Sequence, residues 1–401
     1  MKISNKARNA IFLGTLCSVS YLAVYIARNI LGAVTPKMAA DGFSLDYIGE
    51  ITAVYLLSYA LGQLINGSIG DWIKAKYMIS IGLCSAGIAN LVFVQVSGSA
   101  GIAMAAYAWT GFSLSMIYGP MTKLVAENTD LIYATRCSLG YTFASFFGSP
   151  SAGLLATFLS WQATFRVGSA ALIVMALICF SFFTLFERKG IIRYAVATKG
   201  EARPKKDYKG LFRRHIVKFT GISMLTGVIR TALIGFLSAY YCGYLNYSEE
   251  TSASIFSVST LVIAFTTFVA IFVYEKLKRN MHLSTLIFFS VSLVFFCAVS
   301  FVTVPVVNIV LLVVAIMSSN ASATMLWSVY CPSMKDTGLV SGIVGFLDFA
   351  SYATAALASL LIPHLVSAIG WRGVLLTMAG LMAIGVTISV PYFIQKKKGS
   401  A

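Results

Sequence analysis

The sequence predicts an all-α polytopic membrane protein with twelve transmembrane helices in two pseudo-symmetric six-helix bundles. The first observation is composition: of 401 residues, 58% are apolar and only 11% are charged, whereas a soluble domain is about 25% charged. The second is that apolar runs long enough to cross a bilayer recur along the chain. The third is a repeat that relates the two halves of the chain. Together these observations exclude a cytosolic enzyme, a disordered protein and a secreted disulfide scaffold.

Twelve apolar runs define the predicted helices in order. They are continuous and about twice as long as the roughly ten-residue alternating strands of a membrane β-barrel, so we expect helices. The runs cover residues 10–33, 47–69, 77–97, 100–122, 137–160, 164–187, 217–241, 250–274, 282–303, 305–330, 338–364 and 371–394.

The distribution of basic residues predicts the orientation of these helices. The chain has 30 Lys and Arg against 14 Asp and Glu, which gives a formal charge of +16. Most basic residues fall on the side of the N-terminus, and the opposite side holds only Lys37, Arg166 and Arg372. Cytoplasmic loops carry such an excess, so we predict a multi-pass protein of the plasma (inner) membrane with both termini cytoplasmic. The charge then reflects topology, and we expect no nucleic-acid partner.

A long polar stretch divides the chain into two halves that resemble each other. We predict an N-terminal bundle over 1–187, a cytoplasmic basic linker over 188–216 that lies against anionic lipid, and a C-terminal bundle over 217–401. Trp161 and Trp371 begin similar segments 210 residues apart. This duplication resembles the parallel six-helix halves of major facilitator transporters, whose site lies near the midplane.

Three charged residues lie deep inside the predicted helices: Arg28, Arg230 and Asp348. The two arginines occupy the first and seventh helices, which are equivalent in the repeat, and both are too far from a helix end to reach the interface easily. A guanidinium group offers a planar fork of donors to phosphate or carboxylate oxygens. Two such forks suit an anion with about two negative charges, such as a phosphate monoester. The alternative is that one arginine forms a structural ion pair with Asp348.

Tyrosines share the helix faces near these arginines. Tyr21 and Tyr25 precede Arg28 at i, i+4, i+7 spacing, and Tyr59 follows Tyr55 by one turn on the second helix. Tyrosine hydroxyls in hydrocarbon need partners, so we expect Tyr21, Tyr25 and Tyr59 to line a polar cavity. The alternative, an interfacial belt, suits Tyr107 and Tyr247.

The segment "YLAVYIARNILGAVTPKM…GFSLDYIGEITAVYLLSYALGQLINGSIGD" resembles the organophosphate:phosphate antiporter family, which includes bacterial glycerol-3-phosphate and hexose-phosphate transporters. The similarity extends over nearly the whole chain, including "LWSVYCPSMKDTGLVSGIVGF". The resemblance implies a phosphate-ester cavity with one arginine on the first helix and one on the seventh. Arg28 and Arg230 match those positions, and Tyr21, Tyr25 and Tyr59 match tyrosines near the site.

The chain departs from the family pattern at positions that also bear on substrate. Gln63 stands where relatives commonly have a lysine, Asn29 where a basic residue is common, and Phe143 where a histidine is common. Asp348 is an added acid, which would select a positive or hydroxyl-rich substrate or tune Arg230. The cavity is therefore predicted to be less positive and more aromatic than in those relatives, with Gln63, Asn29 and Asp348 contributing to substrate binding.

We therefore predict a secondary active transporter that moves a phosphorylated small organic anion, of the sugar-phosphate or glycerol-phosphate class, in exchange for inorganic phosphate by alternating access. Its partners are this substrate and the lipid bilayer, and we expect a monomer. We expect no enzymatic activity and no cofactor, because the sequence contains no hydrolase, kinase or Walker A motif. We expect no metal site, because the seven cysteines are scattered without a C-x-x-C pair. Gly342 and Gly345 are expected to allow close helix approach.

Two alternative functions remain at this point. The first is a transporter of another organic anion, a carboxylate, with proton coupling through Asp348. The second is a membrane sensor that binds a phosphate ester without transporting it.

Overall fold

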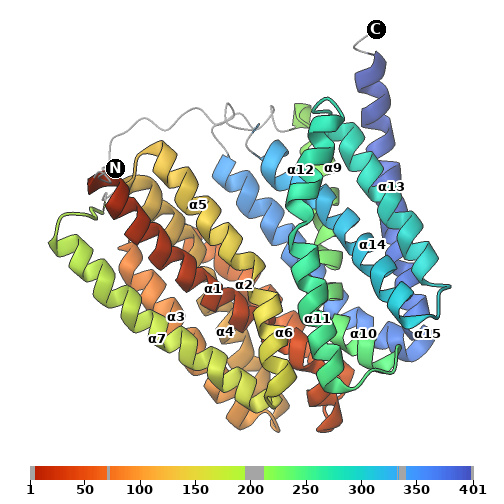
Figure 1. Ribbon diagram of the computed structural model, residues 1–401, viewed down its shortest axis with the longest axis horizontal. Coiled ribbons are helices and arrows are strands. Elements are labelled where there is room, and N and C mark those ends of the chain that lie inside the picture. The colour runs from red at the N-terminus through yellow and green to blue at the C-terminus, as the bar shows by residue number, and fades with distance from the viewer. Residues whose placement is uncertain (1–4, 70–72, 195–211, 332, 334–339, 399–401) are drawn as a thin grey trace. The chain divides into compact units, whose positions relative to one another are not determined.

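The computed structural model describes residues 5–69, 73–194, 212–331, 333 and 340–398. Helices make up nearly all of this described part, which contains no β-strand (Figure 1). In the first half the helices are α1 (Asn5–Ala40), α2 (Leu45–Ile69), α3 (Ala75–Val96), α4 (Ala100–Asn128), α5 (Leu131–Phe146), α6 (Gly148–Phe158) and α7 (Trp161–Arg188). In the second half they are α9 (Ile216–Gly227), η1 (Val228–Leu233), α10 (Leu237–Gly243), α11 (Glu249–Ala264), α12 (Thr266–Lys276), α13 (Met281–Val299), α14 (Pro305–Met325), η2 (Leu326–Tyr330) and α15 (Val340–Lys398).

The prediction of an all-α polytopic membrane protein is confirmed. Among the described residues, 10 helical segments are long and apolar enough to cross a membrane. One of them, Ile343–Val390, holds the predicted eleventh and twelfth helices, and the backbone leaves helical geometry between them at Gly370 (φ 67°). The predicted fifth helix is divided into α5 and α6, each too short to be counted alone. In its described part, each of the twelve predicted ranges therefore lies mainly on helix.

Two predicted helices are interrupted for identifiable reasons. The break between α5 and α6 falls at Phe147, shortly before Pro150, which has no N–H to donate to the preceding turn. The break between α11 and α12 falls at Phe265, where the Thr266 hydroxyl donates a hydrogen bond to the Ile263 carbonyl, 2.5 Å away. Such a bond from a side chain to the preceding turn bends helices.

The chain divides into two compact units. Unit 1 consists of Met1–Glu201 and Ser248–Val258, and unit 2 of Ala202–Tyr247 and Ser259–Ala401. The first part of α11 belongs to unit 1 because it packs against α6: Ser257 Oγ donates to the Pro150 carbonyl at 2.6 Å. The bundle boundaries at 187 and 217 stay a prediction, and linker residues 195–211 lie outside the described part of the chain.

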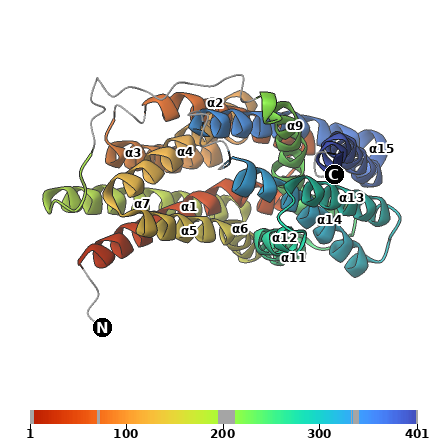
Figure 2. The same ribbon diagram turned by 90° about the horizontal axis from the view of Figure 1, so that it is seen from above.

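Within unit 1, α1 lies beside α5, α6 and α7, while α4 packs against both α2 and α3 (Figures 1 and 2). Within unit 2, α13 packs against α14 and α15, and α15 also packs against α9 and η1. The two repeated tryptophans have similar places in their own units. Trp161 Nε1 donates to Asp41 Oδ2 at 2.7 Å, just after α1, and Trp371 meets Tyr240 edge-on with ring centroids 5.4 Å apart, near the end of α10.

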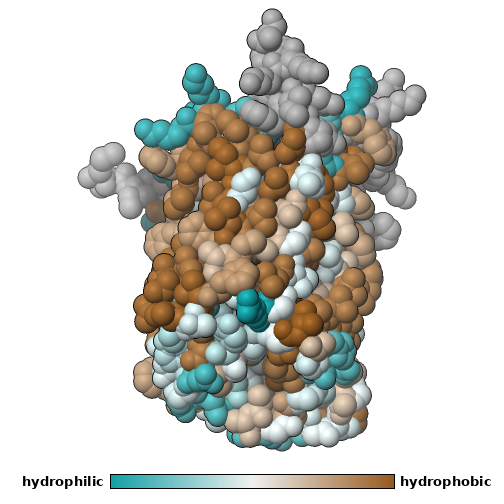
Figure 3. Space-filling model, turned by 90° about the vertical axis from the view of Figure 1, so that its right-hand side faces the viewer, coloured by the Kyte–Doolittle hydropathy of each residue, from teal (hydrophilic) through white to brown (hydrophobic). Residues whose placement is uncertain are grey.

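The outer surface is apolar, as a bilayer requires. Figure 3 shows the side of the molecule where α13, α14 and α15 lie; hydrophobic residues cover most of it, and hydrophilic residues gather toward its ends. Large apolar side chains are exposed in both units, among them Phe158 (77%), Leu177 (64%) and Val294 (62%). In water this much exposed apolar surface would promote association, whereas lipid chains solvate it.

Candidate substrate-binding site

Arg28 lies in the middle of α1 and faces tyrosine rings. Its guanidinium carbon is 4.8 Å from the ring centroid of Tyr59 on α2 and 5.5 Å from that of Tyr25, one turn earlier on α1. The spacing predicted Tyr25 and Arg28 on one face, and the structure places Tyr59 beside them. A cation over an aromatic face is stabilised by the ring quadrupole. This contact orients the guanidinium without using its in-plane N–H donors.

A larger tyrosine cluster extends from this contact. The Tyr21 ring lies 4.9 Å from Tyr25, 5.4 Å from Tyr118 on α4 and 5.9 Å from Tyr141 on α5. Sequence reasoning identified Tyr21 and Tyr25 but missed Tyr118 and Tyr141. Each of these two lies more than four residues from the other tyrosine of its helix, Tyr107 on α4 and Tyr133 on α5, so no short spacing marks them and only the packing of α1, α4 and α5 brings them together.

Tyr107 shows that the interfacial alternative was wrong for this residue. It is only 2% exposed, and its ring centroid lies 5.0 Å from that of Tyr55 on α2. Its other ring neighbours are Phe93 and Phe165, at 5.0 Å and 6.1 Å. Tyr107 is therefore part of the packed interior behind Tyr55, and Tyr55 in turn stacks on Tyr59 at 6.4 Å.

Asn29 and Gln63 are half-buried polar residues close to this cluster in the sequence. The Asn29 amide donates to the Tyr25 carbonyl at 2.7 Å, so one of its donors is used by its own helix. Gln63 follows Tyr59 by one turn on α2, and it makes no hydrogen bond within the described part of the chain. The side chain of Phe143, the position of the family histidine, lies outside the described residues.

The surroundings of Arg230 differ from those of Arg28. It lies on the π-helical segment η1, half-buried, with its guanidinium carbon 5.8 Å from the ring centroid of Trp327 on the second π-helical segment, η2. Single π-helical turns are rare and frequently occur at functional sites. Among the described residues the structure records no ion pair at Arg230. The alternative of a structural pair between Arg230 and Asp348 is thus not supported.

Asp348 lies on α15, in unit 2, where α15 packs closely against α9. The preceding carbonyl, of Leu347, accepts a hydrogen bond from Ser223 Oγ at 2.7 Å. Gly227, directly before η1, lies so close to Ser351 that an added Cβ would come within 2.6 Å of the Ser351 carbonyl oxygen. This packing fixes the α15 backbone around Asp348 against the end of α9.

Close helix approach uses other glycines than those predicted. Gly345 has open space where a Cβ would lie, so the expectation for it was wrong, and Gly342 is not among the glycines whose surroundings are described. Close contacts occur at several other glycines, among them Gly227 and Gly148, and a Cβ added at Gly148 would lie 2.3 Å from the Tyr25 Cβ. Gly148 therefore permits α6 to pack directly behind the face that bears Tyr25.

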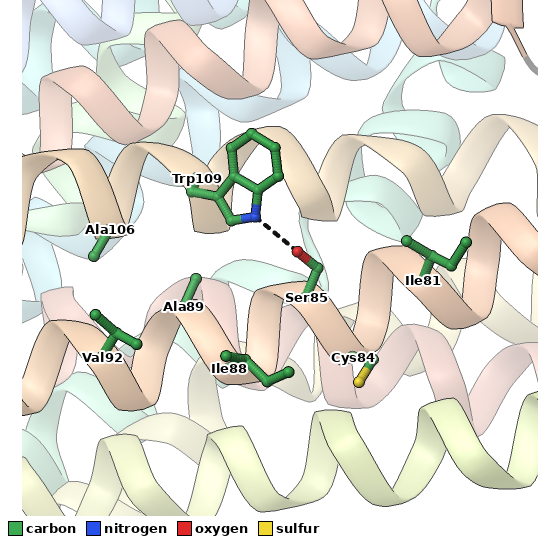
Figure 4. A pocket seen from close by; sticks show the side chains of 8 residues that line it. All are labelled: Ile81, Cys84, Ser85, Ile88, Ala89, Val92, Ala106 and Trp109. Atoms are coloured by element: carbon green, nitrogen blue, oxygen red, sulfur yellow. Dashed lines mark hydrogen bonds between the residues drawn. The ribbon is translucent and has the colours of Figure 1, made fainter.

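A separate groove lies on the outer surface between α3 and α4 (Figure 4). Its volume is about 440 Å³, and its lining is apolar apart from a hydrogen bond from Trp109 Nε1 to Ser85 Oγ at 2.7 Å. It contains none of the predicted site residues and no charged residue. Such a groove suits a hydrocarbon chain and offers nothing to an anion.

Comparisons with known proteins agree with this architecture. Residues 17–356 match the Major Facilitator Superfamily, and the chain belongs to this family. Among solved structures, it is similar to a bacterial homologue of the human lysosomal transporter Spinster (TM-score 0.77, 13% identity, covering 95% of this chain and 96% of that one). It is also similar to a D-xylose–proton symporter (TM-score 0.74, 12% identity, 95% and 96%). The protein is thus a membrane transporter by fold and family.

Curated relatives match over shorter stretches. The chain is 29% identical over 76 residues to the membrane sensor protein UhpC of Escherichia coli, covering 19% of this chain and 17% of that protein. It is 38% identical over 47 residues to sugar phosphate exchanger 3 of Mus musculus (12% and 10%). It is 28% identical over 76 residues to a probable hexose phosphate transport protein of Chlamydia pneumoniae (19% and 17%). These matches, which span less than a fifth of those proteins, support the resemblance to the organophosphate:phosphate antiporter family.

Proposed function

We propose that this transporter exchanges a phosphorylated small organic anion for inorganic phosphate by alternating access, with Arg28 and Arg230 both binding the phosphoryl group. The observation that carries the proposal is that each guanidinium group faces aromatic rings. The guanidinium carbon of Arg28 is 4.8 Å and 5.5 Å from two tyrosine ring centroids, and that of Arg230 is 5.8 Å from the centroid of Trp327. A ring stabilises the cation from its face, and a guanidinium group binds a tetrahedral anion through the N–H donors in its own plane.

Exchange follows from the charge of such a site. A charged arginine in a membrane interior is costly, and a phosphate dianion would add negative charge beside both arginines. A carrier that changes state only when the substrate neutralises both arginines would cycle slowly when empty. We also propose that the protein lies in a plasma membrane with both termini cytoplasmic, as the distribution of basic residues predicts. The proposed functional unit is the monomer.

The proposal is tested by counterflow in proteoliposomes loaded with unlabelled inorganic phosphate and supplied with labelled phosphate outside. Wild-type protein should accumulate label, and Arg28→Lys and Arg230→Lys should each reduce the rate by about 100-fold or more, because lysine keeps the charge and loses the bidentate fork. Lys37→Arg, at a position outside the proposed site, is the matched control and should exchange normally. Wild-type protein that is folded and does not exchange phosphate would contradict the proposal.

A second candidate is favoured by one comparison, since UhpC is named a membrane sensor protein. A sensor would bind the phosphate ester without flux. Saturable phosphate binding to purified protein, combined with no counterflow, would select the sensor. Carboxylate uptake driven by a proton gradient, lost in Asp348→Asn, would select the proton-coupled carrier.

A further inference from the structure

A run of polar residues occupies the C-terminal third of α14, a helix that is otherwise strongly apolar. The sequence reads "SSNASAT" from Ser318 to Thr324, within a membrane span that runs from Pro305 to Tyr330. Polar side chains at this depth are costly and tend to be functional. Neither the proposed phosphate site nor the helix packing described above uses them.

Part of this run is satisfied by its own helix and part is not. Ser318 Oγ donates to the Val314 carbonyl at 2.8 Å, and Thr324 Oγ1 donates to the Asn320 carbonyl at 3.1 Å. In contrast, Ser319 Oγ, Asn320 Oδ1 and Ser322 Oγ are buried and make no hydrogen bond within the described part of the chain. Ser319 and Ser322 are 0% exposed. Buried polar atoms are nearly always paired in folded proteins, so the unpaired amide oxygen of Asn320 indicates a polar ligand. At 3.6 residues per turn, Ser319 and Ser322 project about 100° and 160° away from Asn320 around the helix axis, so they do not share its ligand.

The position of Asn320 relates this run to Arg230. Asn320, Thr324 and Trp327 follow i, i+4, i+7 spacing and share one face of the helix. Trp327 carries the ring that faces Arg230. Asn320 lies about 10 Å from Trp327 along the helix axis at 1.5 Å per residue. The neighbouring face, with Ala321 and Met325, packs against Ala270 and Phe288 in an apolar cluster.

We propose that Asn320 binds a hydroxyl group of the organic part of the substrate while Arg230 binds its phosphoryl group. This inference rests on the proposed function. An amide offers both donors and an acceptor, which is the complement of a hydroxyl group. A substrate of the proposed sugar-phosphate or glycerol-phosphate class carries such hydroxyl groups. An alkyl phosphate of the same length leaves the amide unpaired, and a site built to hydrogen-bond a substrate rejects the analogue that lacks the hydroxyl.

The test compares two competitors of labelled phosphate counterflow: glycerol phosphate, and propyl phosphate, which has the same carbon chain without hydroxyls. In wild-type protein the half-inhibitory concentration of glycerol phosphate should be at least tenfold lower than that of propyl phosphate. Asn320→Leu, which keeps the shape and removes the hydrogen bonds, should reduce this ratio to about one. Ser318→Ala is the matched control, because the Ser318 hydroxyl is already bonded to its own helix, and it should keep the wild-type ratio.

The outcomes separate the two proposals. Absence of phosphate counterflow in folded wild-type protein would overturn the proposed function. Normal counterflow with no preference for glycerol phosphate, or a preference that persists in Asn320→Leu, would overturn the hydroxyl subsite alone. If Asn320→Leu does not fold, Asn320→Ser decides the same ratio, and the expected result is an intermediate preference.

Discussion

The two arginines occupy equivalent helices of a duplicated sequence, yet their surroundings differ. Arg28 lies on a continuous α-helix and faces two tyrosines, which belong to a wider cluster of aromatic side chains on α1, α2, α4 and α5. Arg230 lies on a π-helical segment and faces a tryptophan on another π-helical segment. The comparison teaches that the repeat preserves the charge while each unit supports it with its own packing.

The ion pairs near the loops that follow the second and eighth predicted helices also differ between the two units. In unit 1, Glu187 at the end of α7 accepts from Lys74 at 2.7 Å and from Lys76 at 2.5 Å, and the Lys76 side chain is only 8% exposed. In unit 2, Arg279 and Glu275 are 4.0 Å apart, with side chains 75% and 57% exposed. Only the unit 1 loop therefore holds a buried cation that depends on its partner.

The largest effect on stability is expected from removing that partner. Glu187→Gln should destabilise the protein by about 2 kcal/mol, because it leaves the buried Lys76 ammonium without its carboxylate. Glu275→Gln should cost under about 0.5 kcal/mol, as for exposed pairs. Thermal unfolding of the purified protein in detergent measures both. Equal shifts in the two variants would break the comparison between the loops.

An intermediate effect is expected at the aromatic rings. Trp327→Leu should raise the half-saturating phosphate concentration about tenfold, for a loss of about 1–2 kcal/mol. Tyr59→Leu should raise it less, because Tyr25 still faces Arg28. Trp327→Phe keeps a ring and should recover most of the loss. If Tyr59→Leu proves as costly as Trp327→Leu, the two sites depend on their rings equally.

The sequence was sufficient to predict the twelve helices, because bilayer-length apolar runs have no other stable structure in lipid. It did not predict the breaks at Phe147 and Phe265, which arise from a missing N–H at Pro150 and a side-chain bond from Thr266. Those depend on individual hydrogen bonds, to which average hydropathy is insensitive.

Residues of the candidate site were predictable where one helix brings them together. Tyr21, Tyr25 and Arg28 share a face because of their spacing, and the structure shows Arg28 facing Tyr25. Trp327 could not be assigned to Arg230, because no local pattern relates two residues on different helices. The roles of all these residues in substrate binding stay a prediction that the counterflow experiments address.

The smallest effect concerns pH, and it is confined to unit 2. His215 precedes α9, and its ring centroid is 6.2 Å from that of His282 at the start of α13, whose Nδ1 lies 2.9 Å from the Lys218 ammonium. The repeat offset that relates Arg28 to Arg230 places Leu13 and Leu16 at the positions of His215 and Lys218 in unit 1, so unit 1 has no titratable counterpart there.

Burial, and then the charge of Lys218, lower the pKa of His215 below its ordinary value. The unfolded chain therefore binds more protons than the folded protein as pH falls from about 6.5 toward that lowered pKa, and stability is lost over this window. His215→Gln should flatten the dependence of the unfolding temperature on pH between about 5 and 7. The control variant His364→Gln, on α15 in the same unit, should keep the wild-type dependence. An unchanged slope in His215→Gln would assign the acid sensitivity to another group and remove this difference between the units.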